Sequence, residues 1–281
     1  MKSDLGVMLP GGKTGVLLLH DVGGSAAEQK ALAQALARCG YTVHCPQLIG
    51  LGQSGAAGQG SAGMLVSEAE QALSRLRARC EAVVVIGIAY GGMLALELGR
   101  HNAGAVQAVA VVEPRAWLPS MSFAMPAFLS GRIKQTWLAA LLGLIARARI
   151  NSSNLPAQGV MAAAASGARQ SPATLLGLGK LLDSVHAGLP SVRQPVLMVH
   201  KAYKSRRGHG GSFMLQRRLG GRVESVMIDD GQSGSTHVDR SIETLAERCE
   251  RFIAAVIEEI EIKRGNEARR QKVAAGRTTA A

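Results

Sequence analysis

The residues whose type and spacing could carry chemistry begin with the segment Gly87-Ile88-Ala89-Tyr90-Gly91. It follows an apolar run at residues 82–86 and precedes a helical pattern at 92–100, so the sequence predicts a strand, a tight turn and a helix. A Gly-x-Ser-x-Gly segment in that setting exposes a serine hydroxyl as a nucleophile on a strained corner. Here the tip of the corner is Ala89, whose methyl group can neither attack a substrate nor donate a proton. The pattern predicts the framework that presents a nucleophile, without the nucleophile.

Several stretches around this corner share the pattern of one known family. An apolar run at 16–19 leads into His20-Asp21-Val22-Gly23-Gly24-Ser25, and a helical pattern, a strand and a Gly-Leu-Gly-Gln-Ser segment follow. These stretches resemble the α/β-hydrolase superfamily, specifically its carboxylesterase and monoacylglycerol-lipase-like branch. The resemblance covers about residues 13–113 and 190–260, and it implies that a catalytic serine would stand at the position of Ala89.

The resemblance also implies where the other two members of a catalytic triad would lie. The Ser-Gly-Ser-Thr-His-Val segment is similar to the family's Ser-Gly-His-Val turn with two extra residues before the histidine, and it gives His237 the position of the general base. The alternative is a surface or helix-capping role for His237, and the surrounding resemblance favours the catalytic position. The acid would stand near Lys204, but a cation cannot orient a histidine or stabilise an imidazolium. Glu113, which follows a predicted strand, is a candidate for a relocated acid. The favoured alternative is that Glu113 pairs with Arg115 or with another basic residue.

The loop His20-Asp21-Val22 and Tyr90 are expected to form the oxyanion side of the site. The family usually has His-Gly where this chain has His20-Asp21, so a carboxylate could lie near the N–H donors that a developing oxyanion needs. We favour an Asp21 that points outward or meets a basic residue, over one that weakens oxyanion stabilisation. A mechanism in which Asp21 activates water together with His237 is disfavoured, because nothing in the sequence fixes its geometry. Tyr90 is not expected to replace the serine, because a phenol of pKa about 10 is poorly ionised at neutral pH.

Strand and helix patterns alternate along the first part of the chain and resume near its end. Continuous apolar strands that alternate with helices predict an α/β fold with a mostly parallel central sheet and helices on both faces. No strand is predicted between 114 and 190, where the resemblance implies a helical cap inserted after the family's sixth strand. The expected strands lie at 16–19, 41–45, 82–86, 105–112, 195–200 and 223–228, and the expected helices at 26–39, 62–80, 92–101 and 241–262.

The predicted organisation is an α/β-hydrolase core made of residues 1–113 and 191–262, a cap at 114–190, and a basic tail without ordered structure at 263–281. In the cap, Trp137 and Leu141 share one face of an apolar helical pattern. This pattern fits a lid over an apolar pocket, which we favour, or a helix that rests on a membrane surface. A lid implies a hydrophobic, acyl-type ligand.

Composition limits the partners and the compartment. The formal net charge is +12, and the segment Lys201 to Arg222 has no acidic residue, so the surface would attract anionic ligands or simply stay well solvated. Nucleic-acid binding is disfavoured because only 3% of residues are aromatic. The four cysteines lack metal-ligand spacing, so neither a metal nor a cofactor is expected. No signal peptide or long apolar span is visible, which predicts a cytoplasmic protein.

Two functional hypotheses follow from these observations. The first is a catalytically impaired α/β-hydrolase-like protein that keeps an apolar pocket for ligand binding, or for regulation through a protein partner. The second is an active carboxylic-ester hydrolase that acts on small or lipid esters, either as a serine-to-alanine variant or by another mechanism. The fold alone cannot choose between them, because one fold hosts many functions.

Overall fold

The computed structural model describes residues 6–21, 24–48, 62–115, 172–201, 210–228 and 235–278. In chain order the elements are β1 (Val7–Leu9), β2 (Thr14–Leu19), α1 (Lys30–Arg38), β3 (Thr42–Cys45), α2 (Ala62–Arg77), β4 (Ala82–Ile88), α3 (Tyr90–His101), β5 (Val106–Val112), α6 (Pro172–Gly188), the 3-10 helix η3 (Leu189–Ser191), β6 (Val196–Lys201), α7 (Gly210–Arg218), β7 (Val223–Ile228) and α8 (Ser235–Thr278). Strands and helices alternate along most of this order.

The seven strands form one sheet in the order β1-β3-β2-β4-β5-β6-β7. β1 pairs antiparallel with β3, and the other neighbouring strands pair in parallel. The central strands are apolar and buried on both faces, as the run from Val83 to Ile86 in β4 illustrates. Continuous runs of this kind are typical of parallel strands covered by helices on both sides. The predicted mostly parallel α/β sheet is therefore confirmed.

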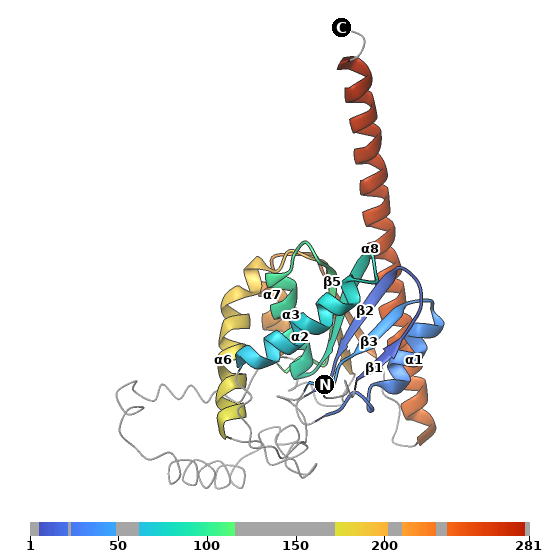
Figure 1. The fold of residues 1–281 in the computed structure, drawn as a ribbon. Coiled ribbons are helices and arrows are strands. Elements are labelled where there is room, and N and C mark those ends of the chain that lie inside the picture. The colour runs from blue at the N-terminus through green and yellow to red at the C-terminus, as the bar shows by residue number, and fades with distance from the viewer. Residues whose placement is uncertain are drawn as a thin grey trace, which may run out of the picture.

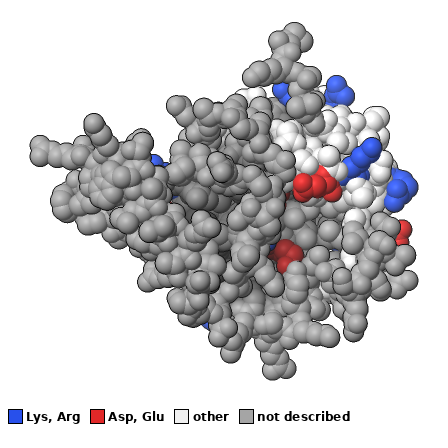
Figure 2. Space-filling model, turned by 90° about the horizontal axis from the view of Figure 1, so that it is seen from below, with Lys and Arg blue, Asp and Glu red and all other residues white. Residues whose placement is uncertain are grey.

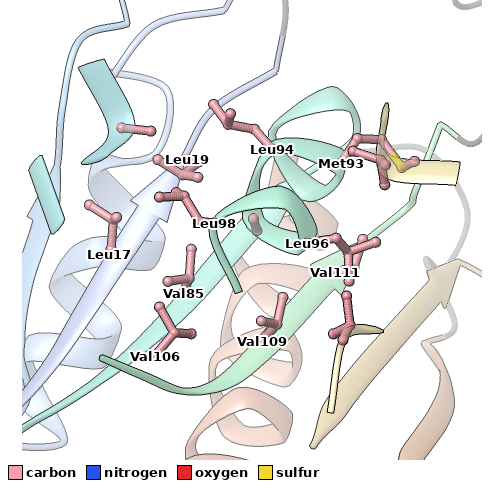
Figure 3. Close-up of a cluster of buried hydrophobic side chains, with 14 of the residues drawn as sticks. Leu17, Leu19, Val85, Met93, Leu94, Leu96, Leu98, Val106, Val109 and Val111 are labelled. Atoms are coloured by element: carbon pink, nitrogen blue, oxygen red, sulfur yellow. The ribbon is translucent and has the colours of Figure 1, made fainter. Parts of the chain in front are cut away.

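Helices cover both faces of the sheet (Figure 1). On one face, α2, α3 and α6 bury their apolar side chains against the strands, and Figure 3 shows part of this cluster, with Leu96 and Leu98 of α3 and Val109 of β5. On the other face, α1 and α8 cover a second cluster that includes Leu36 and Phe252. The two clusters hold the sheet rigidly between its helical layers, as close-packed interiors do.

The register of the strands brings their carboxyl ends into line. Leu19 in β2 pairs with Gly87 in β4, Ile88 in β4 pairs with Val112 in β5, and Val112 also pairs with Val199 in β6. The residues that follow these strands therefore emerge side by side at one edge, called here the carboxyl end of the sheet. Open α/β sheets bind their ligands at this end. The residues that emerge there include His20, Asp21, Ala89 and Glu113.

Helix α6 belongs to the helical layer of the core, although it lies inside the segment predicted as the cap. Its residues Leu178, Leu181, Leu182 and Val185 are buried in the cluster shared with α2 and α3. Their spacing of three to four residues gives the helix one apolar face, which explains why it packs onto the core. The segment 116–171, which holds the rest of the predicted cap, lies outside the described residues.

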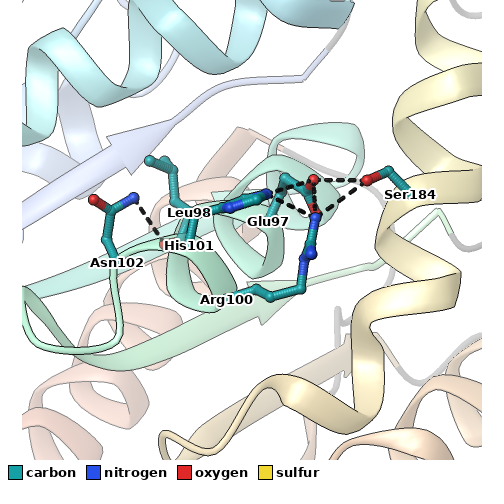
Figure 4. A network of polar contacts seen from close by, with 6 residues as sticks. All are labelled: Glu97, Leu98, Arg100, His101, Asn102 and Ser184. Atoms are coloured by element: carbon teal, nitrogen blue, oxygen red, sulfur yellow. Dashed lines mark hydrogen bonds and ion pairs between the residues drawn. The ribbon is translucent and has the colours of Figure 1, made fainter.

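A polar network also joins α6 to α3 (Figure 4). Glu97 Oε1 accepts hydrogen bonds from Arg100 Nη2 at 2.6 Å and from Ser184 Oγ at 2.8 Å, and His101 Nε2 lies 3.2 Å from the same oxygen. Burial alone would raise the pKa of Glu97, but the hydrogen bonds from Arg100 and Ser184 and the nearby positive charge outweigh burial and lower the pKa. The buried carboxylate therefore stays charged and ties the two helices together.

Helix α8 is longer than the sequence led us to expect. The expected helix covered 241–262, but α8 runs from Ser235 to Thr278, so the structure differs from the prediction of an unstructured tail at 263–281. Residues 261–272 are all exposed, and this part of the helix extends away from the sheet (Figure 1). The local sequence explains the extension, because it is rich in Glu, Arg, Lys, Gln and Ala, has no proline, and forms an ion pair of 2.7 Å between Lys263 and Glu259.

The sequence predicted neither β1 nor α7. β1 is only three residues long and pairs at the edge of the sheet with Thr42–Cys45 of β3, so its sequence carries little strand signal. Helix α7 begins with two glycines and ends in two arginines, and its composition concealed its single buried apolar contact, Leu215. Both elements depend on tertiary pairing more than on local pattern.

Candidate functional site

Ala89 forms the tip of a sharp turn between β4 and α3. Its backbone has φ 52° and ψ −111°, a conformation that residues with a side chain rarely adopt and that costs on the order of 1–3 kcal/mol. The N–H of Ala89 donates to the carbonyl oxygen of Val112 at 2.8 Å, and the N–H of Gly92 donates to the carbonyl oxygen of Ala89 at 3.1 Å. These bonds fix the strained residue between β5 and the first turn of α3.

Glycines make this turn possible by leaving room for neighbouring backbone. A Cβ atom at Gly87 would overlap the backbone of Gly91, and a Cβ atom at Gly91 would overlap the carbonyl oxygen of Leu19. A Cβ atom at Gly92 would overlap the side chain of Val111. The strand, turn and helix therefore pack as closely as the predicted corner requires.

The carboxylate of Asp21 reaches across to this turn from the loop after β2. Asp21 Oδ1 accepts a hydrogen bond from the backbone N–H of Tyr90 at 3.1 Å, and Asp21 Oδ2 lies 3.8 Å from Arg115 Nε. Asp21 therefore lies near a basic side chain, Arg115, which is the arrangement that we favoured. It also accepts a hydrogen bond from the first backbone N–H of α3, that of Tyr90. The sequence did not suggest Arg115 as its partner, because the contact joins the segments after β2 and after β5, which lie far apart along the chain.

His20 anchors the same loop from inside the protein. The ring is fully buried, Nδ1 donates to the carbonyl oxygen of Asp21 at 2.8 Å, and Nε2 accepts from the N–H of Leu48 at 3.1 Å. One nitrogen donates and the other accepts, so the ring is neutral in this arrangement. Burial lowers the pKa of His20, which agrees with a neutral ring. The sequence could not predict the hydrogen bond from Leu48, because every residue except proline has a backbone N–H.

Tyr90 follows Ala89 and packs against the core cluster of α2 and α3. Burial raises the pKa of its phenol, with a small opposing effect from the charge of Arg115. A phenol with a raised pKa is even less ionised at neutral pH than an ordinary tyrosine. Tyr90 therefore contributes its backbone N–H to the site, and its ring is suited to packing.

Glu113 is the first residue after β5 and lies at the carboxyl end of the sheet. Its backbone φ is 51°, and its N–H donates to the carbonyl oxygen of Val199 at 2.8 Å. Glu113 thus shares with Ala89 a left-handed conformation that is uncommon outside glycine. Whether its carboxylate replaces the family's acid or serves a pairing role stays a prediction.

The remaining predicted site residues are described less fully or not at all. His237 belongs to the first turn of α8, which begins before the position expected for the helix, and only its backbone is described. Four predicted site residues lie outside the described residues: Val22, Lys204, Trp137 and Leu141. Seen from below, the described charged side chains that are visible are of both signs (Figure 2).

Within the described ranges, no group of His, Cys, Asp and Glu side chains could hold a metal ion. The four cysteines are free thiols, and burial raises the pKa of Cys45 and of Cys249 to about 12. Thiols with such a pKa are inert as nucleophiles at neutral pH. None of the described helices is both long and apolar enough to span a bilayer.

Comparison with known families assigns the class of protein that this fold and site define. The model of the "Alpha/beta hydrolase family" matches residues 16–248, and the chain belongs to that family. A thermostable monoacylglycerol lipase of Bacillus sp. (strain H-257) is 35% identical over 92 residues, which are 32% of this chain. The chain spans only 37% of the length of that curated relative, so the match identifies kinship and leaves the activity open.

Solved structures show the same fold at low sequence identity. A structure reported for LipS and LipT, two metagenome-derived lipolytic enzymes, has a TM-score of 0.63 at 18% identity and covers 91% of this chain and 99% of its own. The monoacylglycerol lipase of Paleococcus ferrophilus has a TM-score of 0.56 at 15% identity and covers 87% and 99%. Est1E of Butyrivibrio proteoclasticus, bound to ferulic acid, has a TM-score of 0.57 at 14% identity and covers 87% and 90%. The α/β-hydrolase fold is therefore established.

Proposed function

We propose that this chain is a catalytically impaired member of the α/β-hydrolase family that binds a ligand at the carboxyl end of its sheet without hydrolysing it. The observation that carries the proposal is the position of Ala89 at the tip of the β4–α3 turn, in the strained conformation of a nucleophile elbow. Ala89 stands where the family's serine would stand, and a methyl group cannot form the acyl-enzyme intermediate. Removal of a triad serine lowers kcat about a million-fold in a well-studied protease.

The rest of the triad supports the same proposal. The position of the family's acid falls at Lys204, and a lysine there would repel a protonated His237 rather than stabilise it. Glu113, at the end of β5, is the residue that could replace the acid. Even with that replacement, His237 would have no hydroxyl to deprotonate at the elbow.

The ligand that we propose is small, apolar and of acyl type, because members of the same family with similar folds are named as lipases and esterases. The basic segment from Lys201 to Arg222 favours an anionic group at one end of that ligand. The predicted cap would also suit a protein partner or a peripheral contact with a membrane surface. We propose that the protein acts in the cytoplasm. Nucleic acid fits less well because stacking residues are few.

Ester hydrolysis tests the proposal directly. The unmodified chain, incubated with a short-chain aryl ester, is expected to release the phenol at the rate of buffer alone. The comparison protein is Ala89→Ser, which restores the hydroxyl at the tip of the turn. Turnover by the unmodified chain that disappears in His237→Ala would show that the alternative function, an ester hydrolase with another mechanism, is the correct one.

Ligand binding is tested separately from turnover. Both tryptophans of the chain, Trp117 and Trp137, lie in the predicted cap, so their fluorescence reports on a ligand that enters beneath it. Titration with a monoacylglycerol is expected to change the emission in a saturable manner. Trp137→Phe is the control that removes the tryptophan on the predicted apolar face. An emission spectrum that is independent of lipid would argue against an acyl-type ligand.

A further inference from the structure

The carboxylate of Asp21 lies on the amide of the residue that follows Ala89. The N–H of Tyr90 donates to Asp21 Oδ1 at 3.1 Å. In α/β-hydrolases the N–H of the residue after the nucleophile is one of the two donors that bind the oxyanion. From this contact we propose that Asp21 is an internal ligand that occupies this donor and closes the oxyanion site to an ester carbonyl.

The inference rests on the proposed function, because it concerns the same site. It adds a second obstacle to ester hydrolysis, at the oxyanion donor, that does not depend on Ala89. A serine at position 89 could attack an ester only if the carbonyl oxygen could approach Tyr90 N. With Asp21 Oδ1 on that N–H, the carbonyl oxygen would meet a negative charge. The oxyanion site is thus a departure from an esterase that is separate from those at the nucleophile, Ala89, and at the acid position, Lys204.

The backbone around Asp21 holds its side chain at this place. The pairing of β2 with β4 brings the loop after Leu19 beside the turn after Ile88. The absence of a side chain at Gly91 allows that approach, because a Cβ atom there would lie 2.6 Å from the carbonyl oxygen of His20. The buried ring of His20 then fixes the peptide of Asp21 through its Nδ1 hydrogen bond of 2.8 Å. A side chain held by its backbone loses less entropy when it binds the donor.

Charge makes the carboxylate a better ligand for this donor than an ester is. Asp21 is an anion at the first turn of α3, where the helix dipole favours negative charge, and its second oxygen lies 3.8 Å from Arg115 Nε. A hydrogen bond to an ionised acceptor is about twice as strong as one between neutral groups. A neutral ester carbonyl therefore does not displace Asp21. The side chain is 32% exposed, so a small anion from solvent can reach the donor once Asp21 is removed.

The amide proton of Tyr90 gives a direct measurement of this contact. In the full chain with Ala89 retained, Asp21→Gly, which installs the family's usual residue, is expected to shift the Tyr90 amide proton upfield by loss of the charged acceptor. Titration with sodium acetate is expected to reverse that shift in a saturable manner, with acetate as the replacement anion. Asp21→Asn is the matched control, because its neutral amide oxygen can still reach the donor but binds it more weakly than a carboxylate does. The unmodified chain is not expected to respond to acetate, and Asp21→Asn is expected to respond less than Asp21→Gly.

Activity provides the second arm, in proteins that carry Ala89→Ser. Removal of one oxyanion donor costs about 100-fold to 1000-fold in an enzyme that uses it. Addition of Asp21→Gly to Ala89→Ser is therefore expected to raise aryl-ester hydrolysis by about 100-fold or more. Addition of Asp21→Asn is expected to raise it by less, because the amide oxygen still reaches the donor but carries no charge.

The inference is overturned if Asp21→Gly leaves the Tyr90 amide shift unchanged, or if acetate moves that shift equally in the unmodified chain. It is also overturned if Ala89→Ser alone is as active as the double variant. Should Asp21→Gly not fold, Asp21→Ala also removes the carboxylate without adding another acceptor and is measured in the same way. Turnover by the unmodified chain would contradict the proposed function. The chemical shift of the Tyr90 amide proton tests the role of Asp21 independently of turnover.

Discussion

The ring of His20 and the backbone of Leu48 are joined by a buried hydrogen bond, in which the N–H of Leu48 donates to His20 Nε2 at 3.1 Å. This bond exists only while His20 is neutral, because a protonated ring has no acceptor nitrogen. It links the loop after β2 to the segment after β3, which approach each other at the carboxyl end of the sheet. The position of Asp21 therefore depends on the protonation state of a residue beside it.

Protonation of His20 is expected to destabilise the protein as the pH falls. Burial lowers the pKa of His20 below its ordinary value of 6.5, so the folded state binds this proton more weakly than the unfolded state. Its contribution to stability is complete above about pH 7 and is lost as the pH falls from 6.5 through the folded-state pKa. The lowered pKa of Glu97 acts in a separate window below its ordinary 4.5, so the range from pH 7 to pH 5 reports on the histidine.

Urea denaturation of the unmodified chain and of His20→Leu checks this expectation. At pH 8 the variant is expected to be less stable by about 1–3 kcal/mol, because leucine offers no acceptor to the buried N–H of Leu48. The difference between the two proteins should narrow towards pH 5. A difference that stays constant across this range would mean that His20 does not titrate between the folded and unfolded states.

The glycine at position 91 is expected to be required for folding, whereas a glycine in another helix is not. Gly91→Ala would force a methyl group against the carbonyl oxygens of Leu19 and His20, at a cost of about 1–3 kcal/mol or more. Gly265→Ala is the matched control, because a Cβ atom there meets nothing within 4 Å. In the exposed part of α8 it should stabilise the local helix by about 0.5–1 kcal/mol without changing the unfolding midpoint of the core. Thermal unfolding should show a lower midpoint for Gly91→Ala and an unchanged midpoint for Gly265→Ala, and equal losses in the two variants would contradict the packing at the turn.

The contact between Glu97 and Ser184 is expected to stabilise the docking of α6 on α3. Ser184→Ala should cost about 1 kcal/mol and Glu97→Gln about 1–3 kcal/mol, because the buried carboxylate accepts from both Arg100 and Ser184. A double-mutant cycle by chemical denaturation should give a coupling energy of at least about 0.5 kcal/mol.

Additive losses in that cycle would show that the contact between α3 and α6 is not formed in solution. Glu81→Gln serves as the control for general charge effects. It removes the exposed ion pair of 2.7 Å between Lys13 and Glu81 and should leave the denaturation midpoint unchanged.

Removal of residues 263–281 is expected to leave the core intact. Residues 261–272 are exposed and lie beyond the apolar clusters, so the truncated chain should unfold at the same denaturant concentration but with a smaller helical signal by circular dichroism. Ile253→Ala, in the buried part of the same helix, should cost about 2–5 kcal/mol. A large loss of stability on truncation would place a contact on the outer part of α8.

The sheet could be predicted from the sequence because each parallel strand is a continuous apolar run. Residues 82–86 and 105–112 predicted β4 and β5 almost to their ends, and the Gly-Ile-Ala-Tyr-Gly segment predicted the turn at Ala89. The contact between Asp21 and Tyr90 could not be predicted, because it depends on the register of β2 with β4 and on the space at Gly91. The extension of α8 beyond residue 262 was not predicted, because the basic charge of residues 263–281 suggested an unstructured tail. The high helix propensity of the same residues favours the helix that is observed.

The pairing of β5 with β6 has a consequence for how much the chain between them can vary. Val112 pairs with Val199, so the sheet closes a loop that contains the whole segment 113–195. The entropy of closing a flexible loop rises only with the logarithm of its length, about 0.6 kcal/mol for each doubling. The two strands can therefore accept insertions between them at little entropic cost, as long as α6 and η3, which pack in the core, are retained. The sheet and these helices act as a fixed frame whose closure depends only weakly on how many residues the chain holds between Val112 and α6.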